Sequence, residues 1–122
     1  MAKILIVDDD PDIVDACRLF LEKEGHQVFA AYNRDEGMTA VEAEKPQLMI
    51  LDVMMEQPDD GIAMARELRK RGFTAPIVMM TSVSRVTGME FGADKDMVPV
   101  DAFLDKPVDP ATLNAKINEL LK

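Results

Sequence analysis

Five short apolar runs alternate with longer stretches in which apolar residues recur at helical spacing. The runs are KILIV at 3–7, QVFAA at 27–31, LMIL at 48–51, PIVMM at 76–80 and AFL at 102–104. Runs of this length are too short for helices and are typical of buried strands. Their alternation with helices predicts an α/β fold in which right-handed crossovers give a parallel sheet covered on both faces.

The first helix is marked at both ends. Asp10 suits the N-cap, Pro11 suits the first helical position and Gly25 provides a stop. The apolar residues between these marks form one stripe, at Ile13, Cys17, Phe20 and Leu21. This pattern predicts a helix over 11–24 with Cys17 in the core.

Capping residues also mark three later helices. The predicted helices are 34–44, opened by a capping box of Asn33 and Glu36; 61–72, capped by Asp60; and 110–121, capped by Asp109 with Pro110 next. The stretch 82–100 contains two glycines and a proline that break any long helix. There we expect a short fourth helix followed by an irregular loop.

Length and charge narrow the possible functions. The 122 residues, 48% hydrophobic and 30% charged, fit one domain over 1–122. With 14 basic and 23 acidic residues the net charge is -9, which disfavours broad binding to nucleic acid or to an anionic membrane. One cysteine, no leader-like start and no membrane-length apolar run predict a cytoplasmic protein without a membrane partner.

The polar residues that follow the predicted strands are the candidates for chemistry, because ligands of parallel sheets bind beyond the carboxyl ends of the strands. These residues are Asp8, Asp9 and Asp10 after the first strand, Asp52 after the third, Thr81 and Ser82 after the fourth, and Asp105 and Lys106 around the end of the fifth. The carboxylates would repel one another unless a cation offset their charge. Since all the expected ligands are oxygen atoms, Mg²⁺ is favoured over zinc.

The same edge carries groups suited to phosphoryl transfer. Lys106 supplies a cation and Thr81 a hydroxyl, and both suit the spread negative charge of a transferring phosphoryl group. Asp52 is then the candidate nucleophile. The basic run at 66–71 is interpreted as a solvated helix face rather than a docking patch.

These residues together resemble the receiver domain of bacterial two-component response regulators, of the chemotaxis-receiver type, over the whole chain. The matching features are the acid pair Asp8 and Asp9 after KILIV, Asp52 after LMIL, Thr81 and Ser82 after PIVMM, Phe103 in the fifth strand, and Lys106 with Pro107. The resemblance implies a flavodoxin-like (βα)₅ three-layer sandwich with strand order 2-1-3-4-5.

The resemblance also implies the role of each residue. Asp52 would accept a phosphoryl group from a histidine kinase or a phosphotransfer protein, and activity would be limited to its own phosphorylation and dephosphorylation. Asp9, Asp52 and the Met54 carbonyl would hold Mg²⁺, with Asp8 assisting through water. Lys106 and Thr81 would contact the phosphoryl oxygens, with Ser82 beside them. Thr81 and Phe103 would then switch a surface for a downstream protein, as a monomer or a phosphorylation-dependent dimer.

Two segments depart from the family pattern. The loop after Asp52 has Glu56 where many receivers have proline, and it runs on to Gly61. The residues KDMVPV at 95–100 separate GAD at 92–94 from DAFLDKP at 101–107, so we expect the region around the fourth helix to be remodelled.

Two other classes of function remain open at this stage. A haloacid-dehalogenase-like phosphatase would use Asp8, and Asp8 and Asp10 satisfy its D-x-D pattern. A receiver-like scaffold would bind its partner independently of phosphorylation. Phosphorylation of Asp8 would favour the phosphatase, and unchanged partner binding after Asp52→Asn would favour the scaffold.

Overall fold

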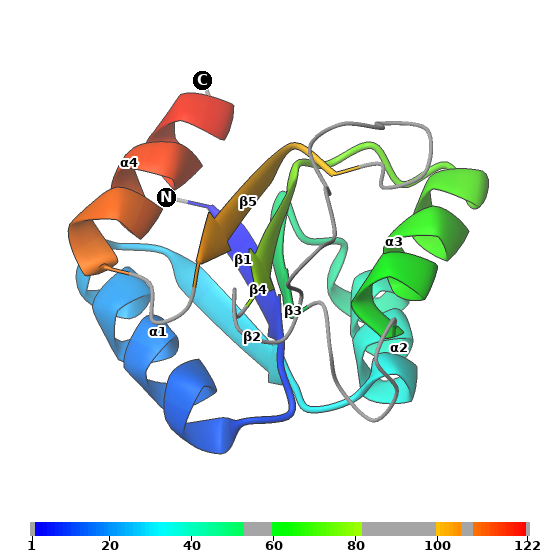
Figure 1. Cartoon of the computed structure of the whole chain (residues 1–122), viewed down its shortest axis with the longest axis horizontal. Helices are drawn as coiled ribbons and strands as arrows, with labels where there is room; N and C mark the ends of the chain where they lie inside the picture. Colours follow the sequence, from blue (N-terminus) through cyan, green and yellow to red (C-terminus); the bar gives the residue numbers. More distant parts are fainter. Residues whose placement is uncertain (1, 53–59, 82–99, 106–108, 122) are drawn as a thin grey trace.

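The computed structural model describes residues 2–52, 60–81, 100–105 and 109–121, with the backbone alone for residues 81 and 105. The elements alternate as predicted (Figure 1). They are β1 (Lys3–Val7), α1 (Pro11–Lys23), β2 (Gln27–Ala31), α2 (Arg34–Glu44), β3 (Leu48–Asp52), α3 (Asp60–Lys70), β4 (Ile77–Thr81), β5 (Ala102–Asp105) and α4 (Pro110–Leu120).

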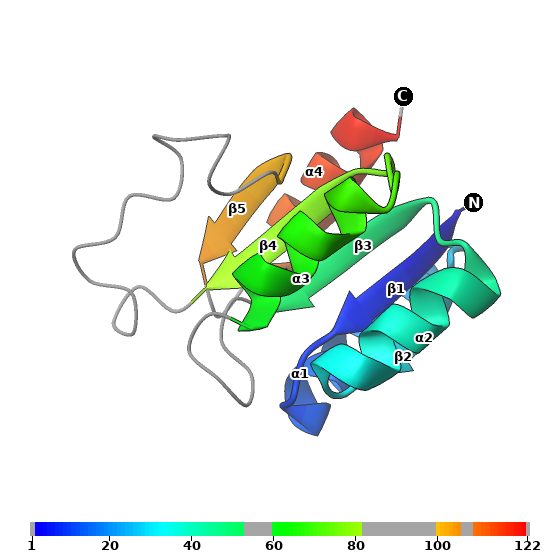
Figure 2. The same ribbon diagram turned by 90° about the vertical axis from the view of Figure 1, so that its right-hand side faces the viewer.

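The strands form one parallel sheet in the order β2-β1-β3-β4-β5. This confirms both the parallel sheet predicted from the apolar pattern and the strand order implied by the family resemblance. β1 and β3 are neighbours, with Val7 opposite Leu51. The residues at the carboxyl ends of these two strands therefore meet at the same edge of the sheet, the one where its strands end. The strands β2 and β5 are the outermost strands of the sheet (Figure 2).

Helices cover both faces of the sheet, with α1 and α4 on one side and α2 and α3 on the other (Figure 1). Successive residues of β1 alternate between the two cores: Leu5 and Val7 pack on the α2 and α3 side, and Ile4 and Ile6 on the α1 and α4 side. All four side chains are fully buried. A central parallel strand is apolar throughout because both of its faces lie in a core.

The predicted helix caps are present in α1, α2 and α4. The side chains of Asp10, Asn33 and Asp109 accept hydrogen bonds from the backbone N–H groups of Asp12, Glu36 and Thr112, respectively. Gly25 follows α1 with a positive φ of 96°, a conformation that glycine adopts without a steric penalty. The N–H groups of Gly25 and His26 donate to the carbonyls of Glu22 and Leu21, which completes the helix end.

Several element ends differ in detail from the sequence expectations. Asp60 is the first residue of α3 rather than the residue before it, and a carboxylate is favourable there because the first helical turn carries partial positive charge. Asp52 and Thr81 end β3 and β4 instead of following them. The expected short fourth helix and the remodelled region belong to the stretch 82–100, of which 82–99 lies outside the described residues. Across the described parts of the chain, no helix is both long and apolar enough to span a membrane.

Candidate functional site

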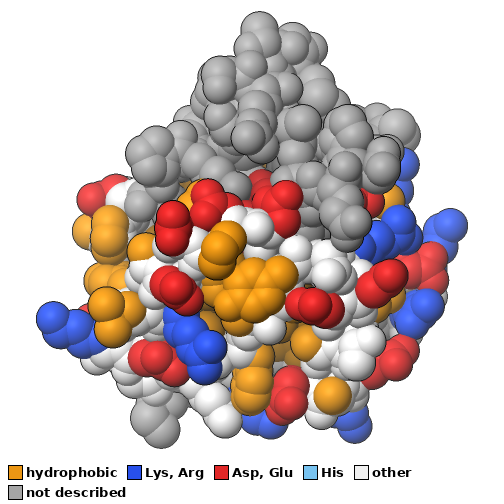
Figure 3. Space-filling view, turned by 90° about the horizontal axis from the view of Figure 1, so that it is seen from below, with side chains coloured by type: hydrophobic (Ala, Val, Ile, Leu, Met, Phe, Trp, Pro, Cys, Tyr) orange, Lys and Arg blue, Asp and Glu red, His pale blue; other side chains and the backbone are white. Residues whose placement is uncertain are grey.

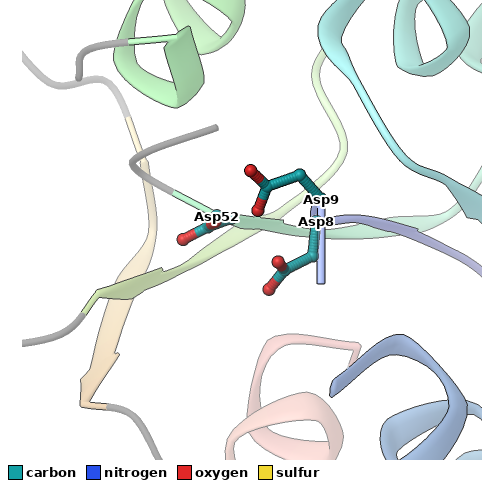
Figure 4. A group of neighbouring side chains, drawn as sticks. All are labelled: Asp8, Asp9 and Asp52. Atoms are coloured by element: carbon teal, nitrogen blue, oxygen red, sulfur yellow. The ribbon is translucent and has the colours of Figure 1, made fainter. Parts of the chain in front are cut away.

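Three carboxylates meet at the carboxyl ends of β1 and β3. Asp8 and Asp9 directly follow β1, and Asp52 is the last residue of β3. One carboxylate oxygen from each residue lies within 4.8 Å of the others (Figure 4). Among the described residues, they are the one group of acidic, histidine or cysteine side chains placed to hold a metal ion.

The backbone around Asp8 explains how adjacent aspartates take different places. The Asp8 N–H donates to the Ala31 carbonyl at 3.1 Å, which holds residue 8 against the end of β2. Its Oδ1 atom accepts a hydrogen bond of 3.0 Å from the Asp10 N–H, so the chain turns immediately after the strand. Asp10 then caps α1, as predicted, and does not join the group of three carboxylates.

The burial of the three carboxylates differs. Asp8 is fully buried, Asp52 is 3% exposed and Asp9 is exposed. Burial removes water that would otherwise screen the negative charges from one another. On the face seen in Figure 3, acidic side chains are spread among basic ones.

The donor set fits a hard divalent cation. Each residue offers carboxylate oxygen, the ligand type that magnesium and calcium prefer, and no histidine or cysteine takes part. The single histidine, His26, directly precedes β2 and so lies where the strands begin, away from their carboxyl ends. Cys17 is buried within α1. Cation binding at this edge is therefore chemically consistent with the residues present.

The other predicted site residues are only partly described. Met54, Ser82 and Lys106 lie outside the described residues. The backbone of Thr81 pairs with Asp105, and Met80 pairs with Asp52, so β4 brings residue 81 to the same edge as the carboxylates. Phe103 is partly buried in β5 and packs against the core on the α2 and α3 side. The roles assigned to these residues stay predictions.

The model of one protein family, the response regulator receiver domain, matches residues 4–118. The chain belongs to this family. This match does not support the phosphatase alternative. The acidic cluster of this chain is therefore interpreted as that of a receiver domain.

Two curated relatives are consistent with this membership. The receiver domain is 36% identical over 124 residues to the alkaline phosphatase synthesis transcriptional regulatory protein PhoP of Bacillus subtilis, covering 98% of this chain and 48% of the relative. It is 38% identical over 124 residues to the probable transcriptional regulator ycf27 of Cyanophora paradoxa, again with coverages of 98% and 48%. The chain thus spans about half the length of these curated relatives.

A solved structure shows the same similarity in three dimensions. The BeF₃-activated N-terminal receiver domain of RstA from Klebsiella pneumoniae matches with a TM-score of 0.85 and 29% identity, covering 98% of both chains.

Proposed function

We propose that this receiver domain accepts a phosphoryl group on Asp52 from a histidine kinase or a phosphotransfer protein, in a reaction that depends on Mg²⁺. The phosphorylated form would signal through altered contacts with a downstream protein. The observation that carries the proposal is the meeting of Asp8, Asp9 and Asp52 within 4.8 Å at the ends of two neighbouring strands.

Asp52 is the best candidate acceptor among the three carboxylates. It ends the central strand β3, whose backbone is bonded to β1 on one side and β4 on the other, so its position is fixed. Asp8 is fully buried and Asp9 belongs to the turn that leads into α1. In the transfer, a carboxylate oxygen of Asp52 bonds to phosphorus while the bond from phosphorus to the donor imidazole nitrogen breaks.

The side chains of Asp8, Asp9 and Asp52, with the Met54 carbonyl, would hold the ion. Bound Mg²⁺ offsets the negative charge of the carboxylates and of the incoming phosphoryl group. Lys106 would contribute a second positive charge, and Thr81 and Ser82 hydroxyl groups, at the same edge. We further propose that the domain has no catalytic activity beyond its own phosphorylation and dephosphorylation.

The relatives support the proposal by analogy. The RstA receiver domain was solved in a BeF₃-activated form, and BeF₃ resembles a phosphoryl group bound to a carboxylate. PhoP and ycf27 are named as transcriptional regulators, and the chain spans about half of each. For the output of this receiver domain, we therefore propose only that it contacts a downstream protein.

Incubation with acetyl phosphate and MgCl₂ tests the proposal directly. Intact mass spectrometry should detect one added phosphoryl group, because acetyl phosphate can replace the protein donor. Asp52→Asn should abolish the addition, since an amide is not a nucleophile for phosphorus. Chelation of Mg²⁺ with EDTA should also abolish it.

Asp10→Asn is the matched control. It removes a negative charge two residues from Asp8, but asparagine caps a helix about as well as aspartate. This variant should therefore be phosphorylated as fast as the parent. Addition of the phosphoryl group to Asp8, or no addition to the parent protein, would contradict the proposal.

A further inference from the structure

The start of β5 is held by a set of side-chain and backbone hydrogen bonds at the end of the sheet opposite the acidic cluster. The Asp101 N–H donates to the Ile77 carbonyl at 2.9 Å, and the Ile77 N–H donates back to Asp101 Oδ2 at 2.8 Å. These two bonds fix residue 101 opposite residue 77. The next pair, Val78 with Ala102, begins the regular ladder between β4 and β5.

Arg69 connects the same carboxylate to α3 and to the turn before β4. Its Nη2 donates to Asp101 Oδ2 at 3.0 Å, and its Nη1 donates to the carbonyls of Phe73 at 2.8 Å and Ala75 at 2.9 Å. The guanidinium also lies over the Phe73 ring, with its carbon 5.9 Å from the ring centroid. One side chain thus joins α3, the turn and the start of β5.

This arrangement differs from an ordinary surface ion pair. Isolated exposed pairs contribute little because water and side-chain freedom oppose them. Arg69, however, is only 25% exposed and makes three hydrogen bonds in its fixed planar geometry. Arg71, which directly follows α3, is 51% exposed, and within the described residues it bonds the side chains of Glu67 and Glu42, as expected for a solvated face.

β5 has a particular need for such support. It is an edge strand of four residues, bonded on one side to β4. Ala102 and Leu104 face one core, whereas Phe103 packs against the other. A shift of one residue along β4 would exchange these faces, because side chains alternate along a strand.

We propose that Arg69 and Asp101 form an anchor that fixes the register of β5 and thereby positions the residues that β5 delivers to the acidic edge. Arg69 and Asp101 are positioning residues, since they lie at the far end of the strand. The part of the proposal that concerns the acidic edge rests on the proposed phosphoacceptor function. The part that concerns the register does not.

Hydrogen exchange tests the register directly. In Arg69→Met and in Asp101→Ala, the β5 amides should exchange about tenfold faster relative to the amides of β1 and β3, because bonds to a charged carboxylate are lost. Arg71→Met is the matched control: Arg71 directly follows α3, and the variant loses two ion pairs there, with Glu67 and Glu42, but no bond to Asp101. An unchanged ratio in the first two variants, or an equal change in the control, would overturn the anchor.

Phosphorylation by acetyl phosphate tests positioning. The initial rate at saturating Mg²⁺ should fall about tenfold in Arg69→Met, since small misplacements of reacting groups slow chemistry strongly. The Mg²⁺ affinity should stay unchanged, because the three proposed carboxylate ligands lie directly after β1 and at the end of β3, away from Arg69 and Asp101. Arg71→Met should match the parent. A normal rate in Arg69→Met, despite faster β5 exchange, would overturn the positioning role. Failure of the parent itself to react would instead refute the proposed function, and the exchange ratio would still decide the anchor.

Discussion

At position 37, packing against neighbouring side chains, rather than backbone conformation, explains why the residue is glycine. It lies in α2 at a close approach to β1 and α3, and a Cβ atom there would lie 2.7 Å from Met64 Cε and 3.1 Å from both γ-methyls of Val7. The methionine end could move aside. The Val7 methyls belong to a fully buried, β-branched residue on a central strand, so they have little room to yield.

We therefore predict that Gly37→Ala destabilises the protein, although alanine is the better helix former by about 1 kcal/mol. Overpacking of a dense core costs roughly 1 to 3 kcal/mol, so the free energy of unfolding should fall by about 1 kcal/mol net. Urea denaturation measures it. Thr39→Ala, at an exposed position of the same helix, should be neutral or slightly stabilising. A Gly37→Ala protein as stable as the parent would show that Val7 can shift at no cost.

The sequence was informative about some site residues and silent about others. Asp8, Asp9 and Asp52 could be predicted because each stands directly at the end of an apolar run that had to be a strand. Their unequal burial could not, since it depends on the turn that Asp8 makes with the Asp10 N–H. Arg69 was assigned to a solvated face, because its partner Asp101 is 32 residues away in the sequence.

At the scale of elements, local signals located the helices well. Asp10, Asn33 and Asp109 cap the helices that they were predicted to cap, because capping depends on neighbours within three residues. The boundaries moved by a residue or two, as for Asp60 and Thr81, where tertiary contacts decide the ends.

His26 has a role at the start of two strands that the sequence did not indicate. Its Nδ1 accepts a hydrogen bond of 3.2 Å from the Ala2 N–H, which joins the approach to β1 with the approach to β2. Burial lowers the pKa of His26 below its ordinary value of 6.5, while nearby Glu24 partly opposes this shift. A protonated ring could no longer accept the bond at Nδ1.

We predict that this histidine makes the protein less stable as the pH falls below 6.5. The unfolded chain binds the proton more readily than the folded protein, so the contribution is complete above 6.5 and is lost as the pH falls through the lowered pKa. His26→Asn keeps an acceptor close to the position of Nδ1 but does not titrate. Urea denaturation about one pH unit above and below 6.5 should therefore show a smaller loss in His26→Asn than in the parent. Equal losses would contradict a role for His26.

At the scale of the whole molecule, the apolar pattern predicted a parallel sheet but not the order of its strands. Alternation of strands and helices is compatible with several orders, and the order 2-1-3-4-5 came only from the family resemblance. The order matters for function because it makes β1 and β3 neighbours. Without that pairing, Asp8 and Asp52 would not meet.

The meeting of these carboxylates in a chain of net charge -9 should make its stability depend on cations in two distinguishable ways. Any salt screens the general repulsion between surface acids. A site built from Asp8, Asp9 and Asp52 would respond to Mg²⁺ beyond this screening, since a ligand that binds only the folded state stabilises it. At about one hundred times its dissociation constant, such a ligand adds about 2.7 kcal/mol.

We predict that MgCl₂ raises the melting temperature of the receiver domain more than NaCl does at equal ionic strength. Asp52→Asn should melt at a higher temperature than the parent in EDTA, because it removes one of three mutually repelling charges, and it should lose most of the Mg²⁺ response. Asp10→Asn should keep the full response, since Asp10 caps α1 outside the cluster. Thermal scans of the three proteins in the three buffers measure these differences. Identical stabilisation of the parent by the two salts would mean that the carboxylates feel only general screening, and that the cluster holds no ion.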